Sequence, residues 1–485
     1  MAAAYFGLTN EPQLFEDQVA EAPRPVRDLE FTKQHKFVKL DQKILEGLVH
    51  DVDTIHIQLF SGENVVIHIN QRQPINDNDA IAYGVVEGDK GSQVILSMAG
   101  DADGGRTEAM AGTIDFSDGR TFKIDYVGDG VHKLVEIDHN SADLVCEHPE
   151  GPAGFIIGPN GEKIRLWYQR TTIRGGSTVA VPRPRTIRGL NPINRTVSTN
   201  STFAQRVSAR QPLRSVKQSW TSDRTEPNIT FRGTMRVRPP TPKPRPKITF
   251  RGTTRVRPPT PTPTPTQAGA VDILVVYTSG AVEAKGGEAG IKALAGLAVG
   301  NVNTGMKNSG INASAKLVAT AIWSGHTSSG NLISDIRSLT RDADIKALRT
   351  QYKADLVAAL VPGRASGIIG IGSMPSSTSG SKNACWTVTK VATVGAPYRT
   401  FAHEIGHNLG AGHSNSSGAE DAAKGWRFTG SDGKKYRTIM AYSPGIRIPY
   451  YSNPAKSYKD KPTGTSSANN AATIGKIAAK AAGYQ

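Results

Sequence analysis

Cysteine is scarce in this sequence, with two among 485 residues, so a fold held together by a framework of disulfide bonds is excluded. Aromatic residues make up only 6% of the chain, which predicts modest hydrophobic cores. No apolar run approaches the ~20 residues that a membrane-spanning helix requires. The first residues, M-A-A-A-Y-F-G-L-T-N-E, lack the basic and apolar regions of a secretory signal, so no signal peptide is visible.

Acidic residues are few after the first third of the chain. Residues 1–150 hold 12 Lys and Arg against 27 Asp and Glu, a net charge of −15. Residues 151–267 hold 22 against 3, and residues 268–485 hold 24 against 12, which gives +19 and +12. The opposite signs predict that the acidic first part docks on the basic last part. The alternative is that each charge only keeps its own domain soluble.

Residues 1–150 are predicted to form a β-rich domain, because apolar and polar residues alternate in several short runs. The stretch S-D-G between two of these runs is a plausible hairpin turn. This domain contains no catalytic constellation. The predicted strands are Thr54–Phe60, Asn64–Ile69, Ser92–Met98, Gly112–Phe116, Thr121–Tyr126 and His132–Asp138.

Residues 151–267 are predicted to be a linker rich in Arg, Pro and Thr. A 19-residue sequence occurs twice in tandem, at Ile229–Lys247 and Ile248–Thr266, and its proline-rich tail favours an extended polyproline conformation. A semi-rigid spacer is the simpler interpretation. The alternative is a basic arm that binds nucleic acid or another polyanion, although it has no groove-reading motif.

Residues 268–485 are predicted to form an α/β domain, because buried strands alternate with helices. The predicted strands are Val271–Thr278, Ala315–Trp323, Ala354–Val361 and Ala384–Ala392. The predicted helices are one long helix over Ala281–Met306 and one or two over Asn331–Arg349. Gly- and Ser-rich residues from Gly363 to Gly380 are predicted to form a loop that borders a cleft.

The sequence H-E-I-G-H-N-L-G-A-G-H predicts a metal site. His403 and His407 stand four residues apart, so a helix would present both from one face. Glu404 lies between them, where it can act on a bound water. Gly410 can adopt the left-handed conformation that ends the helix, and His413 can then return as a third ligand. Three imidazoles leave one position of tetrahedral zinc open, as in catalytic sites.

This spacing, H-E-x-x-H-x-x-G-x-x-H, resembles the metzincin zinc endopeptidases. The stretch T-I-M-A-Y-S-P at Thr438–Pro444 is similar to their Met-turn, which implies that Met440 forms the hydrophobic floor beneath the zinc. Tyr442 matches the position where astacin-like and serralysin-like members carry a tyrosine that can touch the metal. It would stabilise the oxyanion or act as a displaceable fifth ligand, unless it only packs within the turn.

The order of elements over 271–485 resembles the reprolysin-like metzincins, including bacterial peptidyl-Asp metallopeptidases. Their fold is a mixed sheet with long helices and a zinc-binding active-site helix. Ser414 follows His413 where reprolysin-like members usually carry Asp, a departure shared with matrixins. By the same resemblance, Pro444–Tyr451 walls the pocket for the residue after the cut bond. Arg447 would favour acidic side chains there, or else face solvent.

The resemblance implies a zinc endopeptidase in which Glu404 takes a proton from the zinc-bound water and passes it to the leaving amine. The pattern around G-R-T-F-K-I-D-Y-V-G-D-G is similar to bacterial prosegments, so residues 1–150 are expected to be a prodomain that docks on the catalytic domain of a secreted, latent zymogen. Its substrates would be proteins or peptides. No calcium-binding motif is present. The rival is a non-enzymatic protein that binds polyanions or surfaces through the linker and keeps a structural metal.

The two cysteines leave three alternatives open. A thiolate at Cys146 could occupy the open zinc position and hold the enzyme latent, although its neighbours match no familiar cysteine-switch motif. Cys146 could instead form a disulfide with Cys385, or both could be ordinary buried thiols.

Overall fold

We describe the protein from a computed structural model of the chain. The structure describes residues 13–23, 31–100, 105–139, 154–158, 161–171 and 269–485. The tandem repeat and Cys146 both lie outside these ranges, so the predictions made for them stay predictions. Among the described residues, no helix is long and apolar enough to cross a membrane.

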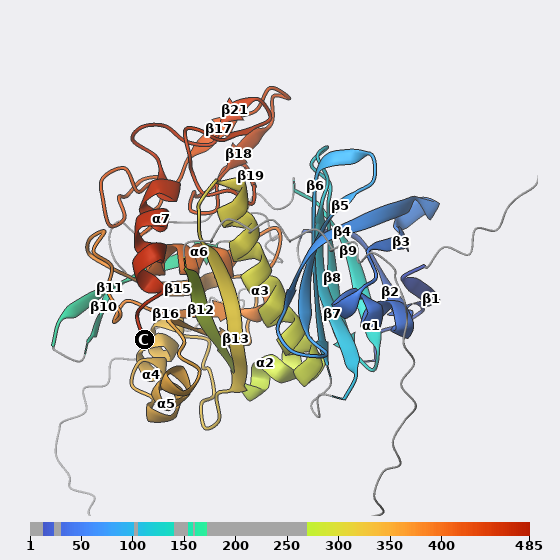
Figure 1. Ribbon diagram of the computed structural model, residues 1–485, viewed down its shortest axis with the longest axis horizontal. Helices are drawn as coiled ribbons and strands as arrows, with labels where there is room; N and C mark the ends of the chain where they lie inside the picture. Colours follow the sequence, from blue (N-terminus) through green and yellow to red (C-terminus); the bar gives the residue numbers. More distant parts are fainter. Residues whose placement is uncertain (1–12, 24–30, 101–104, 140–153, 159–160, 172–268) are drawn as a thin grey trace, which may run out of the picture. The chain divides into compact units, whose positions relative to one another are not determined.

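The N-terminal part forms one nine-stranded antiparallel sheet, with strand order β1-β2-β9-β8-β7-β6-β5-β4-β3 (Figure 1). All six predicted strands are confirmed within it, and the S-D-G turn joins two antiparallel neighbours as predicted. Its strands are Phe15–Val19 (β1), Thr32–Leu40 (β2), Thr54–Gln58 (β3), Asn64–Pro74 (β4), Ala80–Val86 (β5), Asp89–Gly100 (β6), Thr107–Asp115 (β7), Thr121–Gly128 (β8) and Val131–Ile137 (β9). One helix, α1 (Gln42–His50), follows the N-cap residue Asp41, whose side chain accepts a hydrogen bond from the Ile44 N–H and so caps the first turn.

The C-terminal part is built on a seven-stranded mixed sheet, with strand order β10-β11-β15-β16-β14-β12-β13. β12, β13, β14 and β16 run parallel, and β15 and β11 pair antiparallel at one side. The strands are Gly154–Ile157 (β10), Lys163–Thr171 (β11), Ala270–Tyr277 (β12), Ser314–Ile322 (β13), Leu356–Val361 (β14), Gly367–Met374 (β15) and Trp386–Lys390 (β16). The predicted α/β domain with a mixed sheet is therefore observed.

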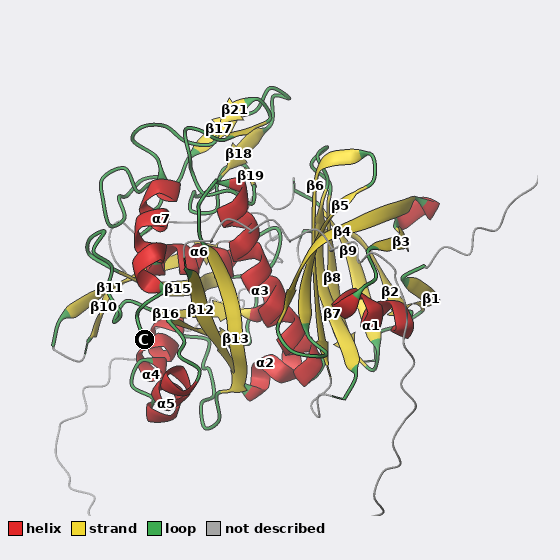
Figure 2. Cartoon of the chain, in the orientation of Figure 1, coloured by secondary structure: helices red, strands yellow, loops and turns green. Residues whose placement is uncertain are grey.

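Six helices and two small sheets complete this part (Figure 2). The helices are Ser279–Ala284 (α2), Glu288–Asn308 (α3), Leu332–Leu339 (α4), Ala343–Gln351 (α5), Thr400–Asn408 (α6) and Asn470–Ala481 (α7). The short strands are Arg427–Thr429 (β17), Lys435–Arg437 (β18), Ile446–Arg447 (β19), Ser457–Tyr458 (β20) and Lys461–Pro462 (β21).

Three sequence-based boundaries need correction. The single helix predicted over Ala281–Met306 is divided into α2 and α3, because Gly286 and Gly287 take left-handed φ angles of 85° and 123° that a helix cannot continue through. The loop predicted over Gly363–Gly380 contains β15, a strand buried over most of its length. β10 and β11, within the predicted linker, form a hairpin that joins the second sheet.

Helix α3 packs against strands of both sheets. Gly300 makes a close approach possible, since a Cβ there would lie 2.7 Å from Ile95 of β6. Gly296 lies even more tightly against Ser97 of the same strand. Ile81, Tyr83 and Ile95 of the first sheet belong to the same hydrophobic core as the apolar residues of α3. The described residues of the N-terminal and C-terminal parts therefore share a core.

Candidate metal centre

Helix α6 carries the first two predicted ligands, and every one of its residues is buried. The helix begins after Arg399, which has a left-handed φ of 49°, and ends at Asn408. The N–H of the next residue, Leu409, donates hydrogen bonds to the carbonyls of Ile405 and Gly406. Gly410 then takes a φ of +81°, so the predicted turn is confirmed. After that turn the chain brings His413 back to the helix.

The three histidines converge as predicted: His403, His407 and His413 each offer a nitrogen, and these atoms lie within 4.8 Å of one another. The Nε2 atoms of His403 and His413 are 3.0 Å apart. Two nitrogens bound tetrahedrally to zinc at about 2.0–2.1 Å would lie about 3.3 Å apart, so this spacing fits a zinc ion.

Backbone carbonyls orient two of these rings. The His403 Nδ1 lies 2.9 Å from the Ile439 carbonyl, and the His407 Nδ1 lies 2.9 Å from the Ala411 carbonyl. A proton on each Nδ1 satisfies the carbonyl and leaves Nε2 as a lone pair directed at the cluster. Burial also lowers the pKa of His403 well below its ordinary value, with the charges of His407 and Arg447 acting in the same direction. The ring is therefore held neutral, as a metal ligand must be.

Glu404 is fully buried beside the histidines. Burial raises the pKa of its carboxyl well above the ordinary value, against smaller opposing effects from Arg447 and the backbone of Gln169. Two glycines of β15 make room for it. A Cβ on Gly370 would lie 2.5 Å from Glu404 Oε1, and a Cβ on Gly372 would lie 3.2 Å from its Oε2.

Tyr442 and Met440 both lie at this centre. The Tyr442 hydroxyl is 2.6 Å from Nδ1 and 2.7 Å from Nε2 of His413. Met440 is fully buried under α6, where a Cβ on Gly406 would lie 2.6 Å from its Sδ. Both side chains therefore lie against the helix and turn that carry the three histidines.

Arg447 is 4% exposed, so in this structure it does not face solvent. Its guanidinium donates hydrogen bonds to the carbonyls of Tyr398 and Ala441, and its charge lowers the pKa of Glu404. Arg437 donates to the same Ala441 carbonyl at 3.0 Å. Two buried cations therefore lie close to the metal centre.

Sequence analysis missed three residues of β11 that also lie at the centre. The Trp167 ring centroid is 5.2 Å from that of His413 and 5.9 Å from that of His407. The Tyr442 hydroxyl donates to the Tyr168 carbonyl at 3.3 Å, and the Gln169 backbone acts on Glu404. A signal was present, since the run I-R-L-W-Y-Q is typical of a strand, but it lay inside the predicted linker.

The remaining predicted residues lie away from the cluster. Cys385 is a free, fully buried thiol, and burial raises its pKa to about 12, so it stays protonated and unreactive. His132 is fully buried, and His326 stacks on Trp323 with ring centroids 3.8 Å apart. Among the described residues, neither histidine belongs to the cluster of His403, His407 and His413.

Sequence comparison agrees with this geometry. Residues 267–452 match the profile of Metallo-peptidase family M12, of the Reprolysin_5 type. This segment is similar to the reprolysin-like metallopeptidases. A peptidyl-Asp metalloendopeptidase of Stenotrophomonas maltophilia (strain R551-3) is 33% identical over 215 residues, which are 41% of this chain and 49% of the relative. Another, of Pseudomonas aeruginosa, is 30% identical over 213 residues, 38% of this chain and 34% of the relative.

The chain thus spans about half the length, or less, of these reprolysin-like relatives. Among solved structures, metalloproteinase-II of Bacteroides fragilis aligns over 84% of this chain and 92% of its own, with 12% identity and a TM-score of 0.37.

Proposed function

We propose that the protein is a zinc-dependent endopeptidase made in a latent form. The observation that carries the proposal is the buried convergence of three histidines around Glu404 and Tyr442. His403, His407 and His413 would hold the ion and leave one position open. When bound there, zinc supplies Lewis-acid chemistry that acidifies a water and polarises a carbonyl.

Glu404 is the proposed general base and acid. Its carboxylate takes a proton from the attacking water and delivers it to the leaving amine, so the proton is conserved through the cycle. The Tyr442 hydroxyl, 2.7 Å from Nε2 of His413, would donate a hydrogen bond to the oxyanion that develops on the scissile carbonyl. Met440 packs against α6 at Gly406 and takes no part in proton transfer.

We further propose a preference for substrates with acidic side chains next to the cut bond. The relatives are named for cleavage at Asp, and in this chain Arg447 and Arg437 lie buried at the centre. A buried guanidinium favours a carboxylate partner because the attraction is strong where water is excluded. Paired peptides that differ only by Asp or Asn after the cut bond would measure this preference.

Latency would come from the acidic N-terminal part, which we propose to be a prodomain docked on the catalytic domain. Charge complementarity supports this role: Arg399, immediately before α6, donates to Asp115 of β7 at 2.6 Å. Lys285, after α2, donates to Asp125 of β8 at 3.0 Å. Secretion is part of the proposal, because a latent form protects the cell that makes a protease.

The test is the Glu404→Gln variant, assayed for peptide hydrolysis and for zinc content after the chain has been cut in the segment 172–268. We expect hydrolysis to fall by about 10²–10⁴-fold, the usual range for a general base, with one zinc retained per chain. Glu283→Gln, at an exposed position of α2, is the matched control and should behave as wild type. Unchanged hydrolysis in Glu404→Gln would remove Glu404 from the mechanism.

A further inference from the structure

The hairpin of β10 and β11 extends the catalytic sheet on the side of the metal centre. β11 pairs antiparallel with β15 from Arg165 opposite Met374 to Thr171 opposite Gly367, with one irregularity after Gln169. β15 in turn contacts α6 and carries the glycines that face Glu404. β11 is therefore an added strand on the strand that borders the catalytic groups.

Residues in the middle of β11 lie over the catalytic groups themselves. The Trp167 ring lies against two of the three histidines, and the Tyr168 carbonyl accepts the hydrogen bond of the Tyr442 hydroxyl. Gln169 is fully buried. Together they leave every group of the centre at most 5% exposed, which is too little for a peptide bond to reach Glu404.

A peptide substrate would have to bind at the edge of β15 that β11 occupies. To be cut, a peptide must bring its carbonyl within hydrogen-bond reach of the Tyr442 hydroxyl and the nitrogen of the same bond near Glu404. The Tyr168 carbonyl and the Gln169 backbone now occupy these two places. An extended peptide that adds to a sheet edge gains main-chain hydrogen bonds along β15. Two chains cannot pair with the same edge of β15.

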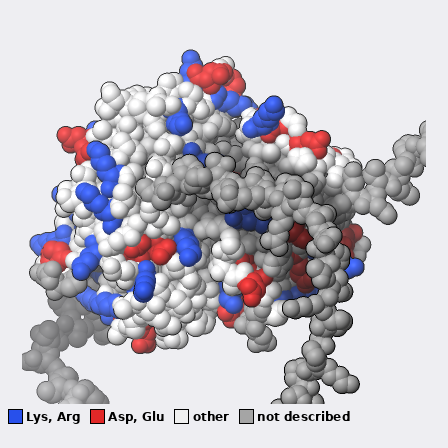
Figure 3. Space-filling model, in the orientation of Figure 1, with Lys and Arg blue, Asp and Glu red and all other residues white. Residues whose placement is uncertain are grey.

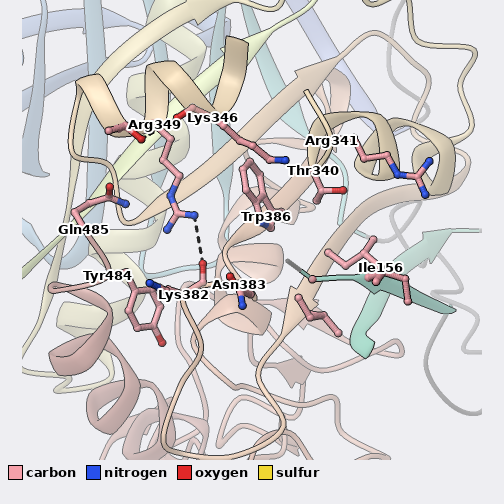
Figure 4. Close-up of a pocket in the computed structure, with 14 residues that line it drawn as sticks. Ile156, Thr340, Arg341, Lys346, Arg349, Lys382, Asn383, Trp386, Tyr484 and Gln485 are labelled. Carbon is pink, nitrogen blue, oxygen red and sulfur yellow. Dashed lines mark hydrogen bonds between the residues drawn. The ribbon is translucent and has the colours of Figure 1, made fainter. Parts of the chain in front are cut away.

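The other end of the hairpin is held at a separate pocket of about 400 Å³ (Figure 4). Ile156 and Ile164 line this pocket together with Trp386, and Asn383 donates a hydrogen bond to Glu162 in the turn. The pocket also carries the basic side chains of Arg341, Lys346, Arg349 and Lys382. Lys and Arg are numerous on this part of the surface, around α4 and α5 (Figure 3).

The hairpin buries only part of its apolar side chains, as expected of a segment that can separate from the sheet. Ile156, Ile164 and Leu166 are buried in the core, but Phe155 is 42% exposed and Ile157 is 62% exposed. The hairpin is also joined to β12 by the segment 172–268, which contains 19 Lys and Arg residues. A cut in that segment removes the covalent tie between the hairpin and the catalytic domain.

We propose that β11 is an intramolecular inhibitor: it occupies the peptide-binding edge of β15 and covers the metal centre until the hairpin leaves. This inference rests on the proposed function and deepens it, since it assigns latency to Trp167, Tyr168 and Gln169. The mature enzyme then binds its substrate along β15 in the place of β11. The active form then has a five-stranded sheet, β15-β16-β14-β12-β13, because β10 pairs only with β11 and leaves with it.

The test uses the full zinc-loaded chain, uncut, with its integrity checked by mass. Leu166→Asp places a charge in the core, and Gln169→Pro breaks the pairing with β15. Each should raise hydrolysis of a quenched peptide by at least about tenfold, because the competent fraction rises as the closed form is destabilised. Arg165→Ala, exposed on the same strand, is the matched control and should leave hydrolysis unchanged.

Hydrogen exchange of the β15 amides gives a readout that does not depend on catalysis. These amides should be protected in the uncut chain and should exchange faster in both variants, and also in wild type once the segment 172–268 is cut and the N-terminal fragment separated. If a variant fails to fold, the cut wild-type protein still decides the question.

The outcomes separate the two proposals. If the cut protein is active while the fragment with β11 stays bound and β15 stays protected, β11 is a permanent strand and the inference is overturned. If β15 is freed but no form of the zinc-loaded protein hydrolyses peptides, the proposed function fails instead.

Discussion

Gly370 of β15 lies directly against the carboxylate of Glu404, with no room for a side chain between them: a Cβ would lie 2.5 Å from Oε1 and 2.9 Å from Cγ. The strand that borders the catalytic groups therefore also determines where the proposed base sits. Glu404 cannot move toward β15, and a residue larger than glycine would push it away from the histidines.

The Gly370→Ala variant should therefore lose activity while it keeps its metal. A displacement of Glu404 by about 1 Å can lower the rate by about 10²-fold. Zinc content and peptide hydrolysis of the cut protein provide the measurement. Gly475→Ala is the matched control, because a Cβ in α7 at that position would have its nearest neighbour 4.0 Å away. Wild-type activity in Gly370→Ala would show that the base is not positioned by β15.

Metal binding should stabilise the folded protein through the three histidines. Zinc that binds only the folded state adds about 2.7 kcal/mol at 100 times its dissociation constant. We expect thermal unfolding of zinc-loaded Glu404→Gln to shift down when a chelator is added, and the shift to vanish in His413→Ala. A chelator shift that persists in His413→Ala would place the bound metal elsewhere.

Asp115→Asn should destabilise the chain strongly. Its carboxylate accepts from the Arg399 guanidinium, which is 2% exposed and also donates to Asn301. Removal of the carboxylate leaves a buried charge without compensation, which costs about 3–5 kcal/mol. Urea unfolding should show this loss. Asp118→Asn, whose carboxylate pairs with Arg120 at an exposed position, should lie within about 0.5 kcal/mol of wild type.

The buried His132 should make stability depend on pH. Burial lowers its pKa to about 3, and its Nε2 accepts a hydrogen bond from the Met110 N–H at 3.0 Å. Below about pH 6.5 the imidazole of His132 is protonated in the unfolded chain. In the folded chain it stays neutral down to about pH 3. The contribution of His132 to the free energy of unfolding is therefore complete above pH 6.5. It falls as the pH drops, by up to about 1.4 kcal/mol per pH unit.

The His132→Gln variant provides the comparison. The difference in unfolding free energy between wild type and variant, measured with urea at pH 7, 6, 5 and 4, should shrink or reverse as the pH falls. A constant difference would mean that His132 takes up its proton in the folded state at an ordinary pH.

Sequence alone predicted the convergence of the three histidines, because its geometry is local. The spacing of His403 and His407 on one helix, and the turn at Gly410, follow from helix periodicity and from the conformational freedom of glycine. Six of the nine strands of the first sheet were predictable for the same reason, since alternation of apolar residues is a signal over five or six neighbours. The other three, β1, β2 and β5, were not predicted.

The structure departs from prediction where long-range packing overrides local preference. Gly367–Met374 contains three glycines, a composition typical of a loop, yet it pairs with two strands and needs two of these glycines, Gly370 and Gly372, to admit Glu404. β11 lies 200 residues before its partner in the sequence, so no short pattern relates it to the metal centre. The pair Gly286-Gly287 is a sequence signal for the division between α2 and α3. The prediction of a single helix followed the helical spacing of the surrounding apolar residues instead.

The contact of α3 with two sheets places a double constraint on its small residues. Gly300 faces Ile95 and Ile81 of the first sheet, while other residues of the same helix lie in the core of the second. A side chain added at Gly300 would push α3 away from the first sheet. Because the helix is rigid, its packing against the second sheet would change as well. Substitutions on either side of α3 should therefore be tolerated only in compensating pairs.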